Sequence, residues 1–248
     1  MKLLSVSLLL SFVVTACSSH TQLAVPASCS PPWSSLAQKE KERTLALVRP
    51  DGDNGLRTYC SGVWLSKTTM VTAGHCVEAA GEQVSILSFG YEEAIPAVVS
   101  AYVPEADLAL LESPPMIDHD VAALGSPPDV GEPVSAVGHP LGMRWSFSCG
   151  HVSALRKLAS TIEGETVDIT WIQATTPISP GSSGGGLWDS SGRLVAIASR
   201  TFVRGQLMGL FVPVSYIPSA NPAGPEPDPT LLAPPEKAPE APADQPTP

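Results

Sequence analysis

The chain is 248 residues long, 43% of them hydrophobic and only 15% charged, and it carries a formal net charge of −10. This composition suits a well-buried β-rich domain better than a disordered chain. No basic cluster offsets the acidic balance, so we do not expect nucleic acid as a partner.

The first sixteen residues predict a signal peptide. Lys2 supplies the positive start, and residues 3–14 form an apolar stretch that is too short to span a bilayer. The stretch ends in Val14-Thr15-Ala16-Cys17, which resembles the box of bacterial lipoproteins, where a Cys after small residues is lipidated once the signal is cleaved. We therefore expect a lipid anchor at Cys17. The alternative is an ordinary signal peptide that is cut nearby.

Residues 17–35 are rich in Ser, Thr and Pro, and we interpret them as a tether between the lipid and the folded domain. Ser18 follows Cys17 where an Asp would indicate retention at the inner membrane, which favours the outer membrane. The protein would then be exported and lie on the periplasmic or cell-surface side of a bacterial membrane.

Residues 36–217 have the size of one compact domain. One short helix is predicted over residues 35–43, with Ser34 or Ser35 as its N-cap, and another helical turn after His75. Elsewhere, short apolar segments alternate with Gly and Pro, which predicts an all-β barrel or sandwich. The predicted strands are residues 44–48, 63–65, 69–71, 84–87, 97–99, 108–111, 134–137, 167–172 and 194–197.

Three short motifs carry chemistry. Ser183 lies in Gly181-Ser182-Ser183-Gly184-Gly185, and a Ser on such a turn needs a base. His is the usual base near neutral pH, and His75 lies 108 residues earlier in Thr72-Ala73-Gly74-His75-Cys76. Between them, Asp107 opens an apolar run and could orient the His. The alternatives are a flexible Ser/Gly loop for the first motif and other acids for the third, namely Asp118, Asp120 and Asp168.

The order His, Asp, Ser is that of the chymotrypsin class. All three motifs resemble the signatures of chymotrypsin-fold serine proteases, and the resemblance covers nearly all of residues 36–217. It implies an all-β fold of two six-stranded antiparallel β-barrels with the active site between them. It also implies His75 as general base, Asp107 as the residue that orients it, and Ser183 as nucleophile. By the same resemblance, the backbone N–H groups of Gly181 and Ser183 form the oxyanion hole. Gly74, where the family usually has Ala, is a mild departure.

Two absences refine the resemblance. The chain has no Ile-Val-Gly-Gly type sequence, and Ser182 stands where animal trypsins have an acid. The chain therefore resembles the bacterial HtrA-like and glutamyl-endopeptidase-like branches. HtrA proteases carry a PDZ domain after the protease domain. Here residues 218–248 hold eleven Pro and five acids, which predicts an extended tail and leaves no room for one. The alternative is a polyproline ligand for a partner domain.

Five Cys is an odd number for an exported protein. If Cys17 carries lipid, four remain for disulfides in an oxidising compartment. The separation of Cys60 and Cys76 resembles that of the disulfide beside the catalytic His in chymotrypsin-like enzymes. Cys29 and Cys149 would then pair by elimination, although nothing local demands it.

Together these features predict a lipid-anchored serine endopeptidase that acts on polypeptides and needs neither a metal nor an organic cofactor. No acid occurs from Trp171 to Ser182, which forms one wall of the family's primary pocket. This disfavours a preference for Lys or Arg, because a buried cation would have no partner, and leaves a small or apolar residue as the default. The alternatives are a catalytically silent binding or scaffold lipoprotein on the same fold, and a serine esterase.

Overall fold

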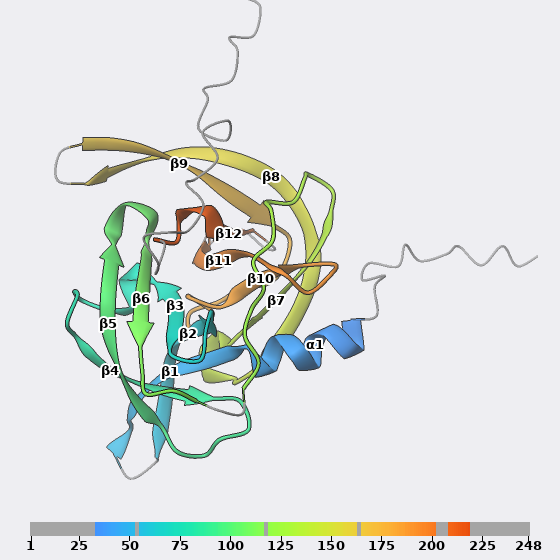
Figure 1. Ribbon diagram of the computed structural model, residues 1–248. Coiled ribbons are helices and arrows are strands. Elements are labelled where there is room, and N and C mark those ends of the chain that lie inside the picture. The colour runs from blue at the N-terminus through green and yellow to red at the C-terminus, as the bar shows by residue number, and fades with distance from the viewer. Residues whose placement is uncertain (1–32, 53–54, 117–118, 163–164, 202–207, 219–248) are drawn as a thin grey trace, which may run out of the picture.

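The computed structural model describes residues 33–52, 55–116, 119–162, 165–201 and 208–218 (Figure 1). The predicted signal peptide, Cys17, the predicted tether up to residue 32 and the Pro-rich residues from 219 onward lie outside these ranges. The described residues form one α-helix, short 3₁₀ turns and twelve strands, which confirms the all-β prediction.

The first six strands close into a barrel in which all neighbours run antiparallel. Its order is β1-β2-β3-β6-β5-β4, and β1 pairs with β4 to close it. Its strands are β1 (Thr44–Pro50), β2 (Leu56–Trp64), β3 (Thr69–Ala73), β4 (Gln83–Ser88), β5 (Ile95–Val103) and β6 (Leu108–Glu112).

The last six strands form a second closed antiparallel barrel. Its order is β10-β11-β12-β9-β8-β7, and β10 pairs with β7 to close it. Its strands are β7 (Pro133–Gly138), β8 (Ser146–Ile162), β9 (Glu165–Ala174), β10 (Gly186–Asp189), β11 (Leu194–Thr201) and β12 (Gly209–Pro213). The two barrels confirm the fold that the resemblance implied.

An apolar cluster joins the barrels. Val63, Val71 and Leu108 from the first barrel pack in one cluster with Trp171 and Trp188 from the second, and all five are fully buried. Each barrel also has a core of its own. Burial of this apolar surface fixes how the barrels sit against each other, and thereby fixes the loops that meet between them.

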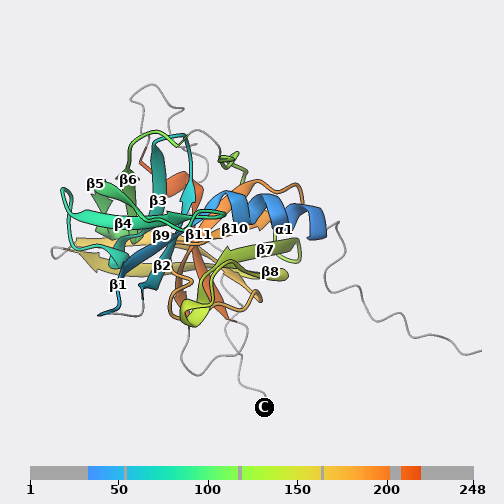
Figure 2. The ribbon, with the colours of Figure 1, turned by 90° about the horizontal axis from the view of Figure 1, so that it is seen from below.

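The helix α1 (Trp33–Glu42) lies against the second barrel beside β7 (Figure 2). It begins two residues before the predicted start, so Ser34 and Ser35 lie inside the helix and the prediction that either is the N-cap is wrong. The physical reason is packing, because the Trp33 side chain is buried against Phe147 with ring centroids 6.0 Å apart and this extends the helix. At the other end, the Thr44 hydroxyl donates to the Glu40 carbonyl at 2.7 Å.

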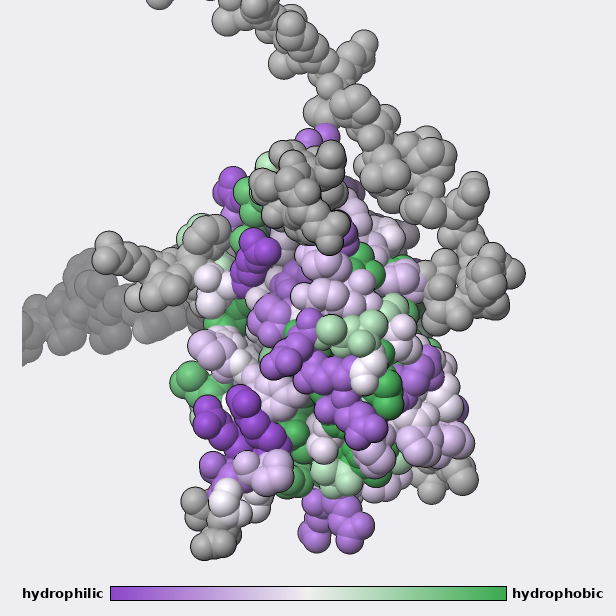
Figure 3. Space-filling view, turned by 90° about the vertical axis from the view of Figure 1, so that its left-hand side faces the viewer, coloured by the Kyte–Doolittle hydropathy of each residue, from purple (hydrophilic) through white to green (hydrophobic). Residues whose placement is uncertain are grey.

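Hydrophilic side chains dominate the face shown in Figure 3, with hydrophobic ones scattered among them in small groups. This face shows no continuous apolar patch of the kind that marks a docking surface. Within the described part of the chain, no helix combines the length and apolar character needed to cross a membrane.

Candidate active site

Ser183 lies on the turn that connects β9 to β10, where glycines are sterically required. Gly181 and Gly184 have φ values of +97° and +86°. A Cβ on Gly184 would lie 2.0 Å from the Ser61 carbonyl oxygen, and one on Gly181 would lie 2.4 Å from that of His139. No side chain fits at either place, so the Gly-rich sequence is what allows the turn to fold against the first barrel.

His75 and Asp107 come from neighbouring strands of the first barrel. His75 lies in a 3₁₀ turn (Gly74–Cys76) directly after β3, and Asp107 lies directly before β6. Because Ala73 of β3 pairs with Leu108 of β6, the two side chains emerge side by side. A Cβ on Gly74 would approach the Asp107 backbone to 3.0 Å, so the departure from Ala at this position gives Asp107 room.

The three side chains form a continuous hydrogen-bonded chain. His75 Nε2 lies 2.9 Å from Ser183 Oγ. On the other side of the ring, Nδ1 lies 2.9 Å and 3.0 Å from the two carboxylate oxygens of Asp107. An ionised carboxylate only accepts, so Nδ1 carries the proton and Nε2 is left to accept from the Ser183 hydroxyl. This tautomer is the one that a general base requires.

Asp107 is held ionised by its surroundings. Its carboxylate also accepts from the His75 backbone N–H at 2.8 Å and from the Ser199 hydroxyl in a short contact. Burial alone would raise the pKa of Asp107, but the hydrogen bonds from His75 and Ser199 and the charge interaction with His75 outweigh it, and the pKa lies below its usual value. Asp107 is therefore a fixed negative charge against the imidazole.

The competing acids do not reach the His. Asp120 pairs with Arg43 at 2.7 Å, and Asp168 is exposed on β9. Asp118 lies outside the described residues. Among the described acids, the structure brings only Asp107 to His75.

The N–H groups of Gly181 and Ser183 are free. Their neighbours on the turn all donate within the protein, Ser182 to Ser179, Gly184 to Ala198 and Gly185 to Ser182. Gly181 and Ser183 donate to no described residue and line the same cavity as the Ser183 and His75 side chains. Two unsatisfied donors beside a nucleophile form a site for a developing oxyanion.

Ser61 holds this turn in place through two hydrogen bonds, and it was not among the predicted site residues. Its backbone N–H donates to the Ser183 carbonyl at 2.7 Å, and its hydroxyl donates to the Gly181 carbonyl at 2.8 Å. Both carbonyls are thus held away from the cavity. The only local signal was that Ser61 follows a Cys of the expected disulfide.

His139 contacts Ser61 on the side away from the cavity, a role that its local sequence does not predict. Its backbone N–H and its Nδ1 lie 3.1 Å and 2.7 Å from Ser61 Oγ. Because the Ser61 hydroxyl proton goes to Gly181, Nδ1 must donate, and the buried Nε2, which has no partner among the described residues, is a bare lone pair. Burial, with a smaller effect from the Arg144 charge, lowers the pKa of His139 to about 3, so the ring is neutral.

The disulfide between Cys60 and Cys76 is present, as predicted. It lies beside His75, and because both sulfurs are used, the cluster of these three residues offers no thiolate to a metal. Cys149 is also disulfide-bonded. Its predicted partner Cys29 lies outside the described residues, as does the proposed lipid site Cys17.

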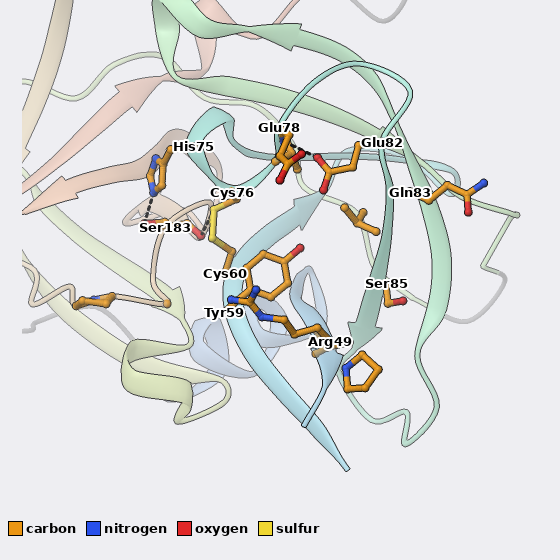
Figure 4. Close-up of a pocket in the computed structure, with 16 residues that line it drawn as sticks. Arg49, Tyr59, Cys60, His75, Cys76, Glu78, Glu82, Gln83, Ser85 and Ser183 are labelled. Carbon is orange, nitrogen blue, oxygen red and sulfur yellow. Dashed lines mark hydrogen bonds between the residues drawn. A yellow bond between two sulfur atoms is a disulfide. The ribbon is translucent and has the colours of Figure 1, made fainter. Parts of the chain in front are cut away.

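A cavity of about 630 Å³ opens in front of the catalytic residues (Figure 4). It runs from Ser183 and His75 past the disulfide to Tyr59 and Arg49. The site is therefore an open cleft that an extended chain can enter.

Comparisons with known proteins agree with this geometry. The family model for the trypsin-like peptidase domain matches residues 60–197, more than half of the chain. A comparison with curated protein sequences gave no match.

Similar solved structures include three bacterial-type proteases. The HtrA-type protease AlgW with a decapeptide is 21% identical with a TM-score of 0.62, over 73% of this chain and 63% of that one. The Rv3671c protease from M. tuberculosis, in its active form, is 19% identical with a TM-score of 0.63, over 76% and 82% of the two chains. The serine endoprotease from Yersinia pestis is 21% identical with a TM-score of 0.61, over 74% and 62%.

The present chain thus spans less than two thirds of the AlgW and Yersinia pestis structures. At these identities the likeness establishes the fold, and the match to the family model establishes the family. The chain belongs to the family of trypsin-like peptidases.

Proposed function

We propose that the protein is a lipid-anchored cell-envelope endopeptidase that cleaves polypeptides through an acyl-enzyme on Ser183. One observation carries the proposal: an unbroken chain of hydrogen bonds runs from Ser183 Oγ through His75 to Asp107, beside two free N–H donors. Nothing has to move before Ser183 can be deprotonated.

The geometry supports a two-stage reaction. His75 Nε2 takes the hydroxyl proton as Ser183 Oγ attacks the peptide carbonyl, and the resulting oxyanion accepts from Gly181 and Ser183. His75 then gives its proton to the leaving amine. Water then attacks the acyl carbonyl carbon while His75 takes one of its protons. His75 returns this proton to Ser183 Oγ as the bond between Oγ and the acyl carbon breaks, and the acyl group leaves as a carboxylic acid. Each oxyanion donor typically contributes about 3 kcal/mol to the transition state.

Polypeptides are the proposed substrates because the cleft is open and elongated. The HtrA-type protease AlgW was solved with a decapeptide, which supports a polypeptide as the ligand of a protein with this fold. A small or apolar residue before the scissile bond is favoured, since the segment from Trp171 to Ser182 contains no acid.

The esterase and the silent scaffold are the competing functions. A scaffold has no need for an intact triad with free oxyanion donors, so the geometry disfavours it. Peptide and ester assays run side by side separate the other two. We expect Ser183→Ala to abolish hydrolysis of an unfolded protein substrate, followed as new peptide termini by mass spectrometry. Ester hydrolysis without any peptide cleavage would instead identify an esterase.

The anchor rests on the Cys17 sequence and needs its own test. We expect the full chain, expressed in a bacterium, to partition with membranes and into detergent, and Cys17→Ala to move it to the aqueous fraction. Mass spectrometry of the mature N-terminus should find acylated Cys17. Release of wild-type protein in aqueous form, with a cut elsewhere, would contradict the anchor.

A further inference from the structure

A second cavity adjoins the catalytic one. It has a volume of about 560 Å³ and shares four lining residues with the first, Arg49, Tyr59, Pro180 and Gly181. It therefore begins at the oxyanion turn and continues away from Ser183, on the side of the disulfide.

Three arginines line this second cavity. Arg49, Arg57 and Arg144 are all exposed there, and Asp51 is the single acid among the described residues that line it. None of the three forms an ion pair with a described residue. In a chain with a net charge of −10, this is a local excess of positive charge without a structural counterion.

Two of the guanidinium groups are held in place. The Arg49 guanidinium stacks on the Tyr59 ring, 4.6 Å from its centroid. Arg144 donates to the Thr58 hydroxyl at 2.9 Å and to the Leu56 carbonyl at 2.6 Å. Where this fold uses arginine as a structural ion pair, as at Arg43 and Arg193, it provides an Asp partner. Arg49 and Arg144 are held in place without one.

In the first cavity, Glu78 and Glu82 line the wall across from Arg49 (Figure 4). The Glu82 carboxylate accepts from the Glu78 backbone N–H in a short contact. An acidic substrate group that passes Ser183 is repelled by these carboxylates and attracted by the arginines. The charges therefore direct it into the second cavity.

The second cavity takes only Pro180 and Gly181 from the expected wall of the primary pocket, and its other lining residues lie outside that wall. The expected wall of the primary pocket, Trp171 to Ser182, takes the residue whose carbonyl is attacked. Residues after the scissile bond would then run the other way, past the disulfide and Tyr59 toward Arg49, all of which line the first cavity.

Building on the peptidase function proposed above, we propose that Arg49, Arg57 and Arg144 form a subsite, the arginine subsite, for a substrate carboxylate on the leaving-group side. An arginine fork matches a carboxylate in shape as well as charge. The carboxylate comes either from an Asp or Glu side chain after the scissile bond or from the C-terminus of a short substrate. The enzyme would then favour acidic substrates despite its own negative charge.

The test uses matched peptides. A peptide that the enzyme cleaves is prepared with Glu or Gln at each successive position after the scissile bond, and with a free or amidated C-terminus. If a side chain supplies the carboxylate, we expect kcat/KM to be about fivefold higher for Glu than for Gln at one position. If the C-terminus supplies it, the same ratio should separate the free from the amidated peptide. In both cases the ratio should fall as salt is added.

The variants decide whether the arginines cause the preference. Arg49→Gln/Arg57→Gln should bring the ratio close to one. The matched control Lys39→Gln/Lys157→Gln removes two exposed charges on α1 and β8 and should keep it. Equal rates for Glu and Gln peptides in the wild type, or a ratio that survives in the arginine variant, would overturn the subsite.

Binding to Ser183→Ala separates this inference from the peptidase function. An extended peptide of Ala and Glu should bind about fivefold more tightly than its Ala and Gln counterpart, and the added Arg49→Gln/Arg57→Gln changes should remove the difference. If the Ser183→Ala protein shows this binding preference but the wild type cleaves no peptide, the peptidase proposal is wrong and the subsite stands. Equal binding of both peptides would sink the subsite.

Discussion

Asp107 adopts a left-handed backbone conformation, with φ of 52°, at the start of β6. This conformation is accessible to Asp and Asn but strained for most other residues. Asn is therefore the substitution that tests the charge alone, because it keeps the backbone and fits the space.

We expect Asp107→Asn to lower kcat by about 10⁴-fold, the loss known for this change in a Ser-His-Asp triad. An Asn side chain can donate to Nδ1, which favours the wrong imidazole tautomer. Steady-state kinetics check the rate, and an unchanged thermal unfolding midpoint shows that the fold is intact. A loss of less than about tenfold would mean that another acid orients His75.

Ser61 is a positioning residue, since it holds the carbonyls of Gly181 and Ser183 but does not face the substrate. Ser61→Ala removes the bond to Gly181, and we expect kcat to fall about tenfold while KM changes little, because the oxyanion forms only in the transition state. Since His139 stays neutral above about pH 4, the loss should be the same from pH 6 to 9. A rise in KM with an unchanged kcat would contradict this role.

At the scale of elements, helix α1 docks on β7 through a buried carboxyl. Glu40 is fully buried, and both its oxygens accept from Ser135 Oγ at 2.9 Å. Burial raises the pKa of Glu40 to about 7, against the lowering effects of Ser135 and the Arg43 charge, and the Asp189 charge adds to the increase. Asp189 is itself paired with Arg193. Glu40 therefore takes up a proton on folding between about pH 4.5 and 7.

The sign of the effect follows from linkage. The folded state binds more protons than the unfolded state in this range, so the contribution of Glu40 to stability falls as pH rises and then levels off. We expect Glu40→Gln to be more stable than the wild type above pH 7, by on the order of 3 kcal/mol, and equal to it near pH 4. Urea unfolding across pH measures the difference. A stability difference between Glu40→Gln and the wild type that does not change with pH would contradict the raised pKa of Glu40.

The strands show what the sequence could and could not predict. All nine predicted segments lie wholly or largely within observed strands. Short apolar runs bounded by Gly and Pro can be recognised as strands from the sequence alone. The longest strand, β8, was missed. Its pairing shifts at a bulge between Val152 and Ala154, which interrupts the alternation, and Leu155 remains 46% exposed. β10 and β12 also lie outside the nine predicted segments, and β2 was predicted only at its end.

At the scale of the molecule, the site exists only because two barrels meet. The first barrel supplies His75, Asp107 and Ser61, and the second supplies the oxyanion turn and Ser199. Each of His75, Asp107 and Ser183 carries a local sequence signature, and the structure brings these three side chains together. Ser61, His139 and Ser199 carry none, and their roles arise from contacts between residues that are distant along the chain.

The central claim is that Ser183 is activated as the structure stands. The most direct measurement is labelling by a fluorophosphonate probe of protein lacking residues 1–17, with Ser183→Ala and His75→Ala as matched controls. We expect the wild type to be labelled at Ser183, located by peptide mapping, and neither variant to be labelled. A folded, disulfide-intact wild type that takes no label, or labels as fast in Ser183→Ala, would contradict it.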